Sequence, residues 1–287
     1  MTRPPRIAFL ALVAGAAVAL PAAAFVCTTP KMASFVSIHW ETRKIPWAIQ
    51  APGSLTLNAT TARQLITASF TAWSEPRCTD LVFDAKGVVM PGTPLDEVPQ
   101  VRFVHQNWQQ EGEVSRDSSA IALTTMTFEK ATGIIHTGII EVNESDPMAP
   151  RADGFVFADA ELSCPEDSAM DLGAVLTHEV GHFIGLAHTD QTLDSQGRPL
   201  PIERQPTMTA AVQPCKKEFR TLEVDDIDGL CTIYPSGRGA RQCGRLPVQE
   251  VPYVESKPFG CSAQRGLAPW WWFAILVLTC SSHRSRR

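Results

Sequence analysis

The first half of the chain alternates short apolar runs with polar and turn-forming residues, a pattern that predicts strands and one long helix. Residues 45–50 form an apolar run typical of a strand, and a second strand starts at residues 81–83. Between them, residues 58–75 place apolar side chains at helical spacing. Asn58 or Thr60 is suited to cap the beginning of that helix, because a side-chain oxygen there can accept a bond from a free backbone N–H group.

Strands dominate the middle of the chain. Residues 85–98 are rich in Pro and Gly and predict a loop, whereas residues 99–105 alternate apolar and polar positions as a half-buried strand does. Two further strands are predicted over residues 119–128 and 134–142. The apolar patch at residues 155–157 is either a short strand or a packing patch inside a long loop.

Residues 171–188 combine a helix with candidate chemistry. His178 and His182 are four residues apart, so on a helix they lie on one face and their imidazoles can bind one metal ion together. Asp167 or Ser168 is suited to cap this helix. The other face is apolar at helical spacing, which predicts packing against a core. Its residues are Leu176, Val180, Phe183 and Ile184.

A third candidate ligand follows this helix. Gly185 tolerates a positive φ, so the helix can end there and the chain can turn sharply. His188 then returns as a third nitrogen ligand, and Glu179 stands beside the first ligand, where it can reach a water on the metal. Three protein ligands with one open position are the arrangement of a catalytic zinc. The sequence therefore predicts one zinc ion on the three histidines, with Glu179 as the general base.

The motif His178-Glu179-x-x-His182-x-x-Gly185-x-x-His188 resembles the extended zinc signature of the metzincin metallopeptidases. Metzincins also carry a methionine turn beneath the zinc, and Met208 in the run Pro206-Thr207-Met208 is the candidate. Within the metzincins the chain resembles the matrixins. Thr189 follows the third histidine, where astacins carry Glu, and residues 222–235 resemble the matrixin C-terminal helix.

The resemblance implies a fold and further roles. It implies an α+β, zincin-like catalytic domain over residues 25–235, with a mixed, mostly parallel five-stranded sheet, long helices and a small C-terminal subdomain. Residues 119–128 would be the edge strand that pairs with an extended peptide substrate. In the family, the residue matching Asp225 can hold the mature amino terminus, and the one matching Asp226 supports the methionine turn.

Three segments depart from the family pattern. Pro76-Arg77-Cys78 resembles the propeptide cysteine switch, but Thr79 replaces the expected Gly and the site lies inside the catalytic domain. These departures favour a structural or disulfide-bonded Cys78 over a switch. The His-Gly-Asp motif of the structural zinc and calcium loop is missing from residues 106–118, so a calcium ion or a second zinc has no support. Residues 189–207 make a longer connection to the methionine turn than matrixins usually have.

Both ends of the chain resemble targeting segments. Residues 1–24 have the basic start, apolar run and small-residue cleavage site of a secretory signal peptide, with Phe25 as the mature start. An uncleaved membrane anchor is the alternative, for which the apolar run is short. Residues 236–260 read as a linker. Residues 261–287 resemble the C-terminal sorting signals of myxobacterial surface proteins, with a tail anchor as the alternative.

Export would permit disulfide bonds between the cysteines that precede the C-terminal segment. Their possible pairings are many, and the sequence cannot choose among them. The preferred pairs are Cys27 with Cys78 and Cys215 with Cys231.

The overall charge excludes one class of partner, because a net charge of −5 does not favour a nucleic-acid surface. The sequence predicts an exported, monomeric zinc endopeptidase, secreted or attached to the cell envelope, that hydrolyses protein or peptide substrates with a zinc-activated water. One alternative is a non-catalytic adhesion protein on the same scaffold, which the intact Glu179 disfavours. The other is an astacin-like metzincin, which Thr189 and the Asp225-Asp226 pair disfavour.

Overall fold

The computed structural model describes residues 25–30, 36–109, 117–165, 169–189, 192–194, 196–210, 212–243 and 248–251. The predicted signal peptide, residues 1–24, and the predicted C-terminal segment, residues 261–287, lie outside these ranges. In the ranges that are described, no helix combines the length and the apolar character needed to cross a bilayer.

The largest sheet defines the fold class. Its strands are β2 (Lys44–Gln50), β3 (Val82–Val89), β4 (Gln100–Phe103), β5 (Ala122–Phe128) and β6 (Ile135–Val142). Their order is β3-β2-β4-β6-β5, and every neighbouring pair is parallel except β5 with β6. The predicted α+β fold with a mixed, mostly parallel five-stranded sheet is confirmed, and β5 lies at one edge of it.

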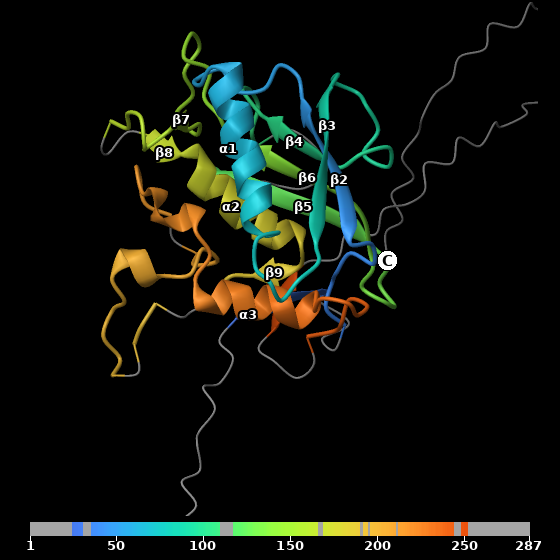
Figure 1. Cartoon of the computed structure of the whole chain (residues 1–287). Helices are drawn as coiled ribbons and strands as arrows, with labels where there is room; N and C mark the ends of the chain where they lie inside the picture. Colours follow the sequence, from blue (N-terminus) through green and yellow to red (C-terminus); the bar gives the residue numbers. More distant parts are fainter. Residues whose placement is uncertain are drawn as a thin grey trace, which may run out of the picture. The chain divides into compact units, whose positions relative to one another are not determined.

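Two helices, α1 (Ala59–Ala72) and α2 (Leu172–Phe183), pack against each other beside this sheet (Figure 1). Asn58, one of the two predicted caps, begins α1 by accepting a hydrogen bond from the Thr61 backbone N–H at 2.9 Å. The helix ends at Ala72, three residues before the predicted end at 75, with Trp73 as its C-cap.

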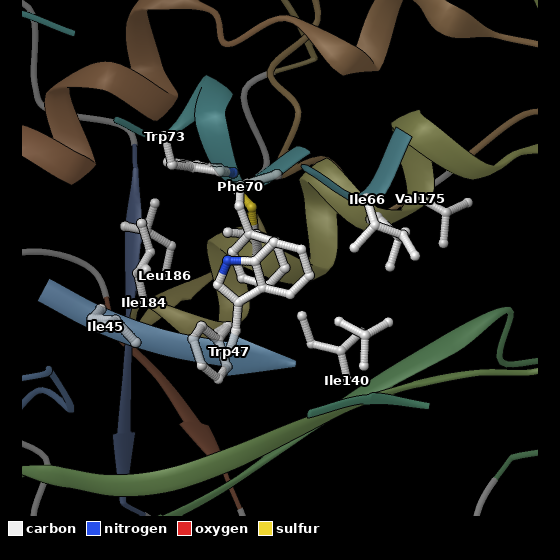
Figure 2. Packing of buried hydrophobic residues seen from close by; sticks show 14 of the residues in the cluster. Ile45, Trp47, Ile66, Phe70, Trp73, Ile140, Val175, Ile184 and Leu186 are labelled. Carbon is white, nitrogen blue, oxygen red and sulfur yellow. The ribbon is translucent and has the colours of Figure 1, made fainter. Parts of the chain in front are cut away.

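Aromatic side chains join the helices to the sheet, as Figure 2 shows around Trp47 and Phe70. The Trp47 ring of β2 stacks on the Phe70 ring of α1 with centroids 4.2 Å apart. The Phe183 ring of α2 meets Phe70 edge-on at 6.1 Å. Because protein interiors are close-packed, these contacts fix the position of α2 relative to the sheet.

Strand β3 runs into the segment that the sequence predicts to be a loop. It continues to Val89, which pairs with Gln50 of β2, so the loop prediction for residues 85–98 is wrong for its first five residues. Gly87 adopts a φ of +86° close to a register shift between the two strands. Glycine favours a loop locally, but here it accommodates an irregularity within a paired strand.

Short elements precede and follow α2. They are β7 (Val156–Ala158), which pairs with β8 (Ala169–Asp171), the 3-10 turns η1 (Ile202–Arg204) and η2 (Lys217–Arg220), and the helix α3 (Val224–Ile233). The strand alternative for residues 155–157 is therefore the observed one, shifted by one residue.

A three-stranded sheet joins the two ends of the described chain. Its order is β10 (Val248–Val251), β1 (Val26–Pro30) and β9 (Leu186–Ala187). Nearby, the Gln242 side chain accepts a hydrogen bond from the Ser37 backbone N–H at 2.5 Å. Residues 236–243 and 248–251 thus belong to the folded domain. The predicted linker over residues 236–260 is wrong for this part, because the pairing that orders it comes from the distant N-terminal strand.

Three disulfides cross-link the described part of the domain, and neither pairing preferred from the sequence is among them. The bonds join Cys27 with Cys243, Cys78 with Cys231, and Cys164 with Cys215. The predicted pairs Cys27–Cys78 and Cys215–Cys231 are therefore wrong. Each observed bond links segments that only the tertiary fold brings together, such as β1 and the chain before β10. The prediction that Cys78 is disulfide-bonded is confirmed.

Candidate metal centre

Helix α2 begins at a different residue from the one predicted. Asp171 is its N-cap, and its side chain accepts a hydrogen bond from the Ala174 backbone N–H at 2.8 Å. Arg220 donates to the same carboxylate and to Asp159, so the cap is itself held in place. The predicted caps Asp167 and Ser168 lie outside the described residues. Since Asp171 ends β8, the helix starts directly from a paired strand.

The structure brings the three predicted ligands together. The Nε2 atom of His188 lies 3.1 Å from Nε2 of His178 and 3.2 Å from Nε2 of His182. Candidate ligand atoms of all three side chains lie within 4.8 Å of one another, and no other such cluster occurs in the described part of the chain. His105 is not part of this cluster, and its Nε2 atom lies 3.0 Å from Glu144 Oε2.

Hydrogen bonds on the far side of two rings decide which nitrogen faces the cluster. His178 Nδ1 lies 2.7 Å from the Thr207 carbonyl oxygen, and His182 Nδ1 lies 2.9 Å from the Leu186 carbonyl oxygen. A carbonyl only accepts, so each Nδ1 carries the proton and each Nε2 presents a lone pair. Lone pairs that converge from several imidazoles repel one another unless a cation lies between them. The donor set therefore fits a metal ion, and imidazole nitrogens suit zinc.

Burial keeps these imidazoles neutral at physiological pH. It lowers the pKa of His178 well below the usual value, lowers the pKa of His182, and brings the pKa of His188 to about 4. Burial has this effect because a low-dielectric environment disfavours the charged form. Metal binding requires neutral imidazole, so the folded site is ready for a cation without first releasing protons.

The turn that returns His188 requires glycine. Gly185 has a φ of +99°, and a Cβ atom there would lie 2.2 Å from the Ile38 carbonyl oxygen. Strand β1 holds the residues just beyond this turn. The Thr28 backbone N–H donates to Gly185 O at 2.9 Å, and Thr28 Oγ1 donates to Leu186 O at 3.0 Å. Leu186 O also accepts from His182, so the N-terminal strand is connected to a candidate ligand through one carbonyl group.

Met208 lies in the turn predicted for it, with its backbone fixed at both ends. Its N–H donates to Asp226 Oδ1 at 3.0 Å, and its carbonyl accepts from the Thr189 N–H at 2.9 Å. The other Asp226 oxygen accepts from the Thr207 N–H at 2.8 Å. Burial raises the pKa of Asp226 to about 6, and these N–H donors oppose that rise. Asp225 accepts hydrogen bonds from the Thr189 side chain and the backbone of Phe25.

Glu179 is buried beside the first histidine, and burial raises the pKa of its carboxyl group to about 7. The Thr124 hydroxyl of β5 donates to its Oε2 atom at 2.6 Å. Sequence reasoning placed Thr124 in the edge strand and gave its side chain no role. It gave none to Thr28 either. No spacing pattern links these residues to α2, because both approach the site only through strand pairing.

These features define a zincin-like metallopeptidase architecture. One helix bears two of the three convergent histidines, a glycine turn returns the third, and a methionine turn lies beneath them. The chain belongs to the matrixin family, whose model matches residues 39–235. Membership implies a zinc-dependent metallopeptidase that acts on protein or peptide substrates, and it agrees with the matrixin rather than the astacin-like prediction. No curated protein matches the chain closely enough to be named.

Proposed function

We propose that this protein is an exported zinc endopeptidase in which Glu179 acts as the general base. The observation that carries the proposal is the position of that carboxyl group. It is 6% exposed, directly follows His178 in α2, and forms no ion pair with a basic side chain in the described residues. A buried carboxyl group beside a metal site is suited to proton transfer rather than to structure.

The mechanism assigns separate tasks to the chain's own residues. His178, His182 and His188 would hold the zinc ion, which when bound supplies Lewis acidity that activates water and polarises the scissile carbonyl. Glu179 takes the proton from the attacking water and delivers it to the leaving amine. Its pKa of about 7 without a metal falls when a cation lies nearby, so the base is ionised at neutral pH.

An extended substrate would bind along β5. This strand pairs with β6 on one side, and among the described residues its other edge has no strand partner. A peptide that adds to that edge would satisfy the backbone N–H and C=O groups there. Because Thr124 of β5 touches Glu179, such a peptide would lie next to the proposed base.

Export and surface attachment are part of the proposal. Three disulfides support an oxidising compartment, since such bonds rarely persist in the cytosol. Residues 1–24, which resemble a signal peptide, would direct export, and residues 261–287, which resemble a sorting signal, would direct attachment to the cell envelope. Removal of residues 1–24 would leave an ammonium group on Phe25, whose backbone N–H donates to Asp225. That charge pair would then tie the mature terminus to α3.

The test compares the zinc-loaded protein, purified after expression of the full chain, with its Glu179→Gln variant in casein hydrolysis. The variant should keep its zinc and lose activity by roughly 10²- to 10⁴-fold, the range of general acid–base catalysis. Chelation should abolish cleavage by the wild-type protein, and added zinc should restore it.

Glu41→Gln is the matched control, because Glu41 is exposed and should tolerate the same change. Turnover by zinc-loaded Glu179→Gln near the wild-type rate would exclude the general-base role. A zinc-loaded wild-type protein that cleaves neither casein nor a library of unstructured peptides would exclude the peptidase itself.

A further inference from the structure

The hydroxyl group of Thr124 makes two close approaches to Glu179. Its Oγ1 lies 2.6 Å from the carboxylate Oε2 and 3.2 Å from the backbone carbonyl oxygen of the same residue. A threonine hydroxyl has one hydrogen to donate. The shorter distance and the negative charge both favour the carboxylate, because charge-assisted O–H···O bonds are shorter and stronger than neutral ones.

This bond makes the two carboxylate oxygens unequal. Among the residues that the structure describes, only Thr124 donates a hydrogen bond to the Glu179 carboxylate, and it occupies Oε2. Oε1 is left for the proton of an attacking water. The terminal torsion of a glutamate is broad and only roughly two-fold, so without a donor the carboxylate plane would be poorly fixed. One threonine thus supplies an orientation that the helix backbone cannot.

The fold holds Thr124 where it can do this. Thr124 pairs with Ile140 in the β5–β6 ladder, and its branched side chain has a restricted first torsion angle. Strand β6 also approaches α2 closely, since a Cβ atom on Gly138 would lie 3.0 Å from the Phe183 ring. The absence of a side chain at Gly138 lets the β5–β6 ladder come near enough for a short threonine side chain to reach α2.

We infer that Thr124 is a positioning residue that orients the general base by holding Oε2 of Glu179. The inference rests on the role of Glu179 proposed above. Thr124 acts through Glu179 and not on the substrate, so its loss lowers the rate of the chemical step and leaves substrate binding unchanged.

The first test is steady-state kinetics of zinc-loaded Thr124→Val, which keeps the side-chain shape and removes the hydroxyl. Its kcat should fall roughly 10- to 100-fold, the range that a hydrogen bond to a charged group supports, at unchanged KM and zinc content. Thr124→Ser keeps the hydroxyl and should retain activity within a few-fold of the wild type. Thr71→Val makes the same change on the exposed face of α1 and should leave kcat unchanged.

A second measurement does not depend on activity. Unfolding midpoints of the metal-free protein at pH 8 are compared for the wild type, Thr124→Val, Glu179→Ala and the double variant. If the bond exists, Thr124→Val lowers the midpoint more when Glu179 is present than when it is Ala. Additive shifts would overturn the inference even if Thr124→Val were too unstable for kinetics.

The outcomes separate this inference from the proposed function. Wild-type and Thr124→Val proteins that cleave equally well would overturn the role of Thr124 and leave the peptidase intact. Loss of activity that Thr124→Ser fails to rescue would reduce Thr124 to a packing role. A zinc-loaded wild-type protein without hydrolysis would instead overturn the proposed function, and the positioning role with it.

Discussion

Gly181 of α2 faces the side chain of the methionine turn so closely that its replacement tests how the two are joined. A Cβ atom there would lie 2.2 Å from Met208 Sδ and 2.8 Å from Cζ2 of Trp73. Ordinary contacts between heavy atoms are about 3.5–4.0 Å, so Sδ would have to retreat by roughly 1.3–1.8 Å. The Met208 backbone is held by Asp226 and Thr189, which leaves only its side chain free to move.

Two opposing effects decide the stability of Gly181→Ala. Alanine in a helix interior is favoured over glycine by about 1 kcal/mol. Overpacking a well-filled core costs about 1–3 kcal/mol, and the upper end applies here because the neighbouring Trp73 ring is fully buried and donates to Thr177 O at 2.8 Å. The net loss should be about 1–2 kcal/mol. For a domain of this size that lowers the melting temperature by about 2–8 °C.

Thermal unfolding of the metal-free protein, followed by circular dichroism, measures this loss without the stabilisation that bound zinc would add. Gly239→Ala is the control, because a Cβ atom at Gly239 would have no neighbour within 4 Å and its melting temperature should not fall. If Gly181→Ala melts at the wild-type temperature or above, the Met208 side chain can move aside without a measurable loss of stability. That result would refute the claim that the methionine turn is fixed against α2.

Two further predictions concern the strand beneath the site and the site's protonation. Replacing both Cys27 and Cys243 by Ser should lower the free energy of unfolding in urea by about 2–5 kcal/mol. The variant should also lose zinc more readily on dialysis, because β1 holds the turn at Gly185. A zinc content equal to that of the wild type would contradict this link between β1 and the metal site. An unfolded histidine binds a proton near pH 6.5, whereas folded His188 binds one only near pH 4, so acidification from pH 6.5 to 4 should lower the stability of the metal-free protein. Stability should fall less steeply with pH in His188→Gln. Equal slopes of stability against pH in the two proteins would contradict this role of His188.

The local sequence was sufficient for the elements that carry the histidines. His178 and His182 share a helix face because the helical repeat places them there, and Gly185 allows the helix to end because glycine tolerates a positive φ. These are consequences of spacing over a few residues. The predictions of a loop over residues 85–98 and a linker over residues 236–260 were wrong in part, because the structure of each segment depends on a partner from elsewhere.

Strand pairing accounts for the clearest differences between the predicted elements and the observed structure. Residues 85–89 have the composition of a loop, but β2 offers them a ladder of hydrogen bonds. The segment after Pro235 has the composition of a linker, but β1 and the Cys27–Cys243 bond hold it on the domain. In both cases the partner is distant in sequence, so no local pattern records the pairing.

The sequence by itself determined the zinc-ligand motif, the helix that carries it, the methionine turn and the family, since all of these reside in short-range spacing and residue type. The tertiary structure alone decided which cysteines join, that Asp171 begins α2, and that Thr124 holds Glu179. The physical reason is the same throughout. A ligand motif lies within one segment, whereas a disulfide, a paired edge or a positioning hydrogen bond exists only when two distant segments meet.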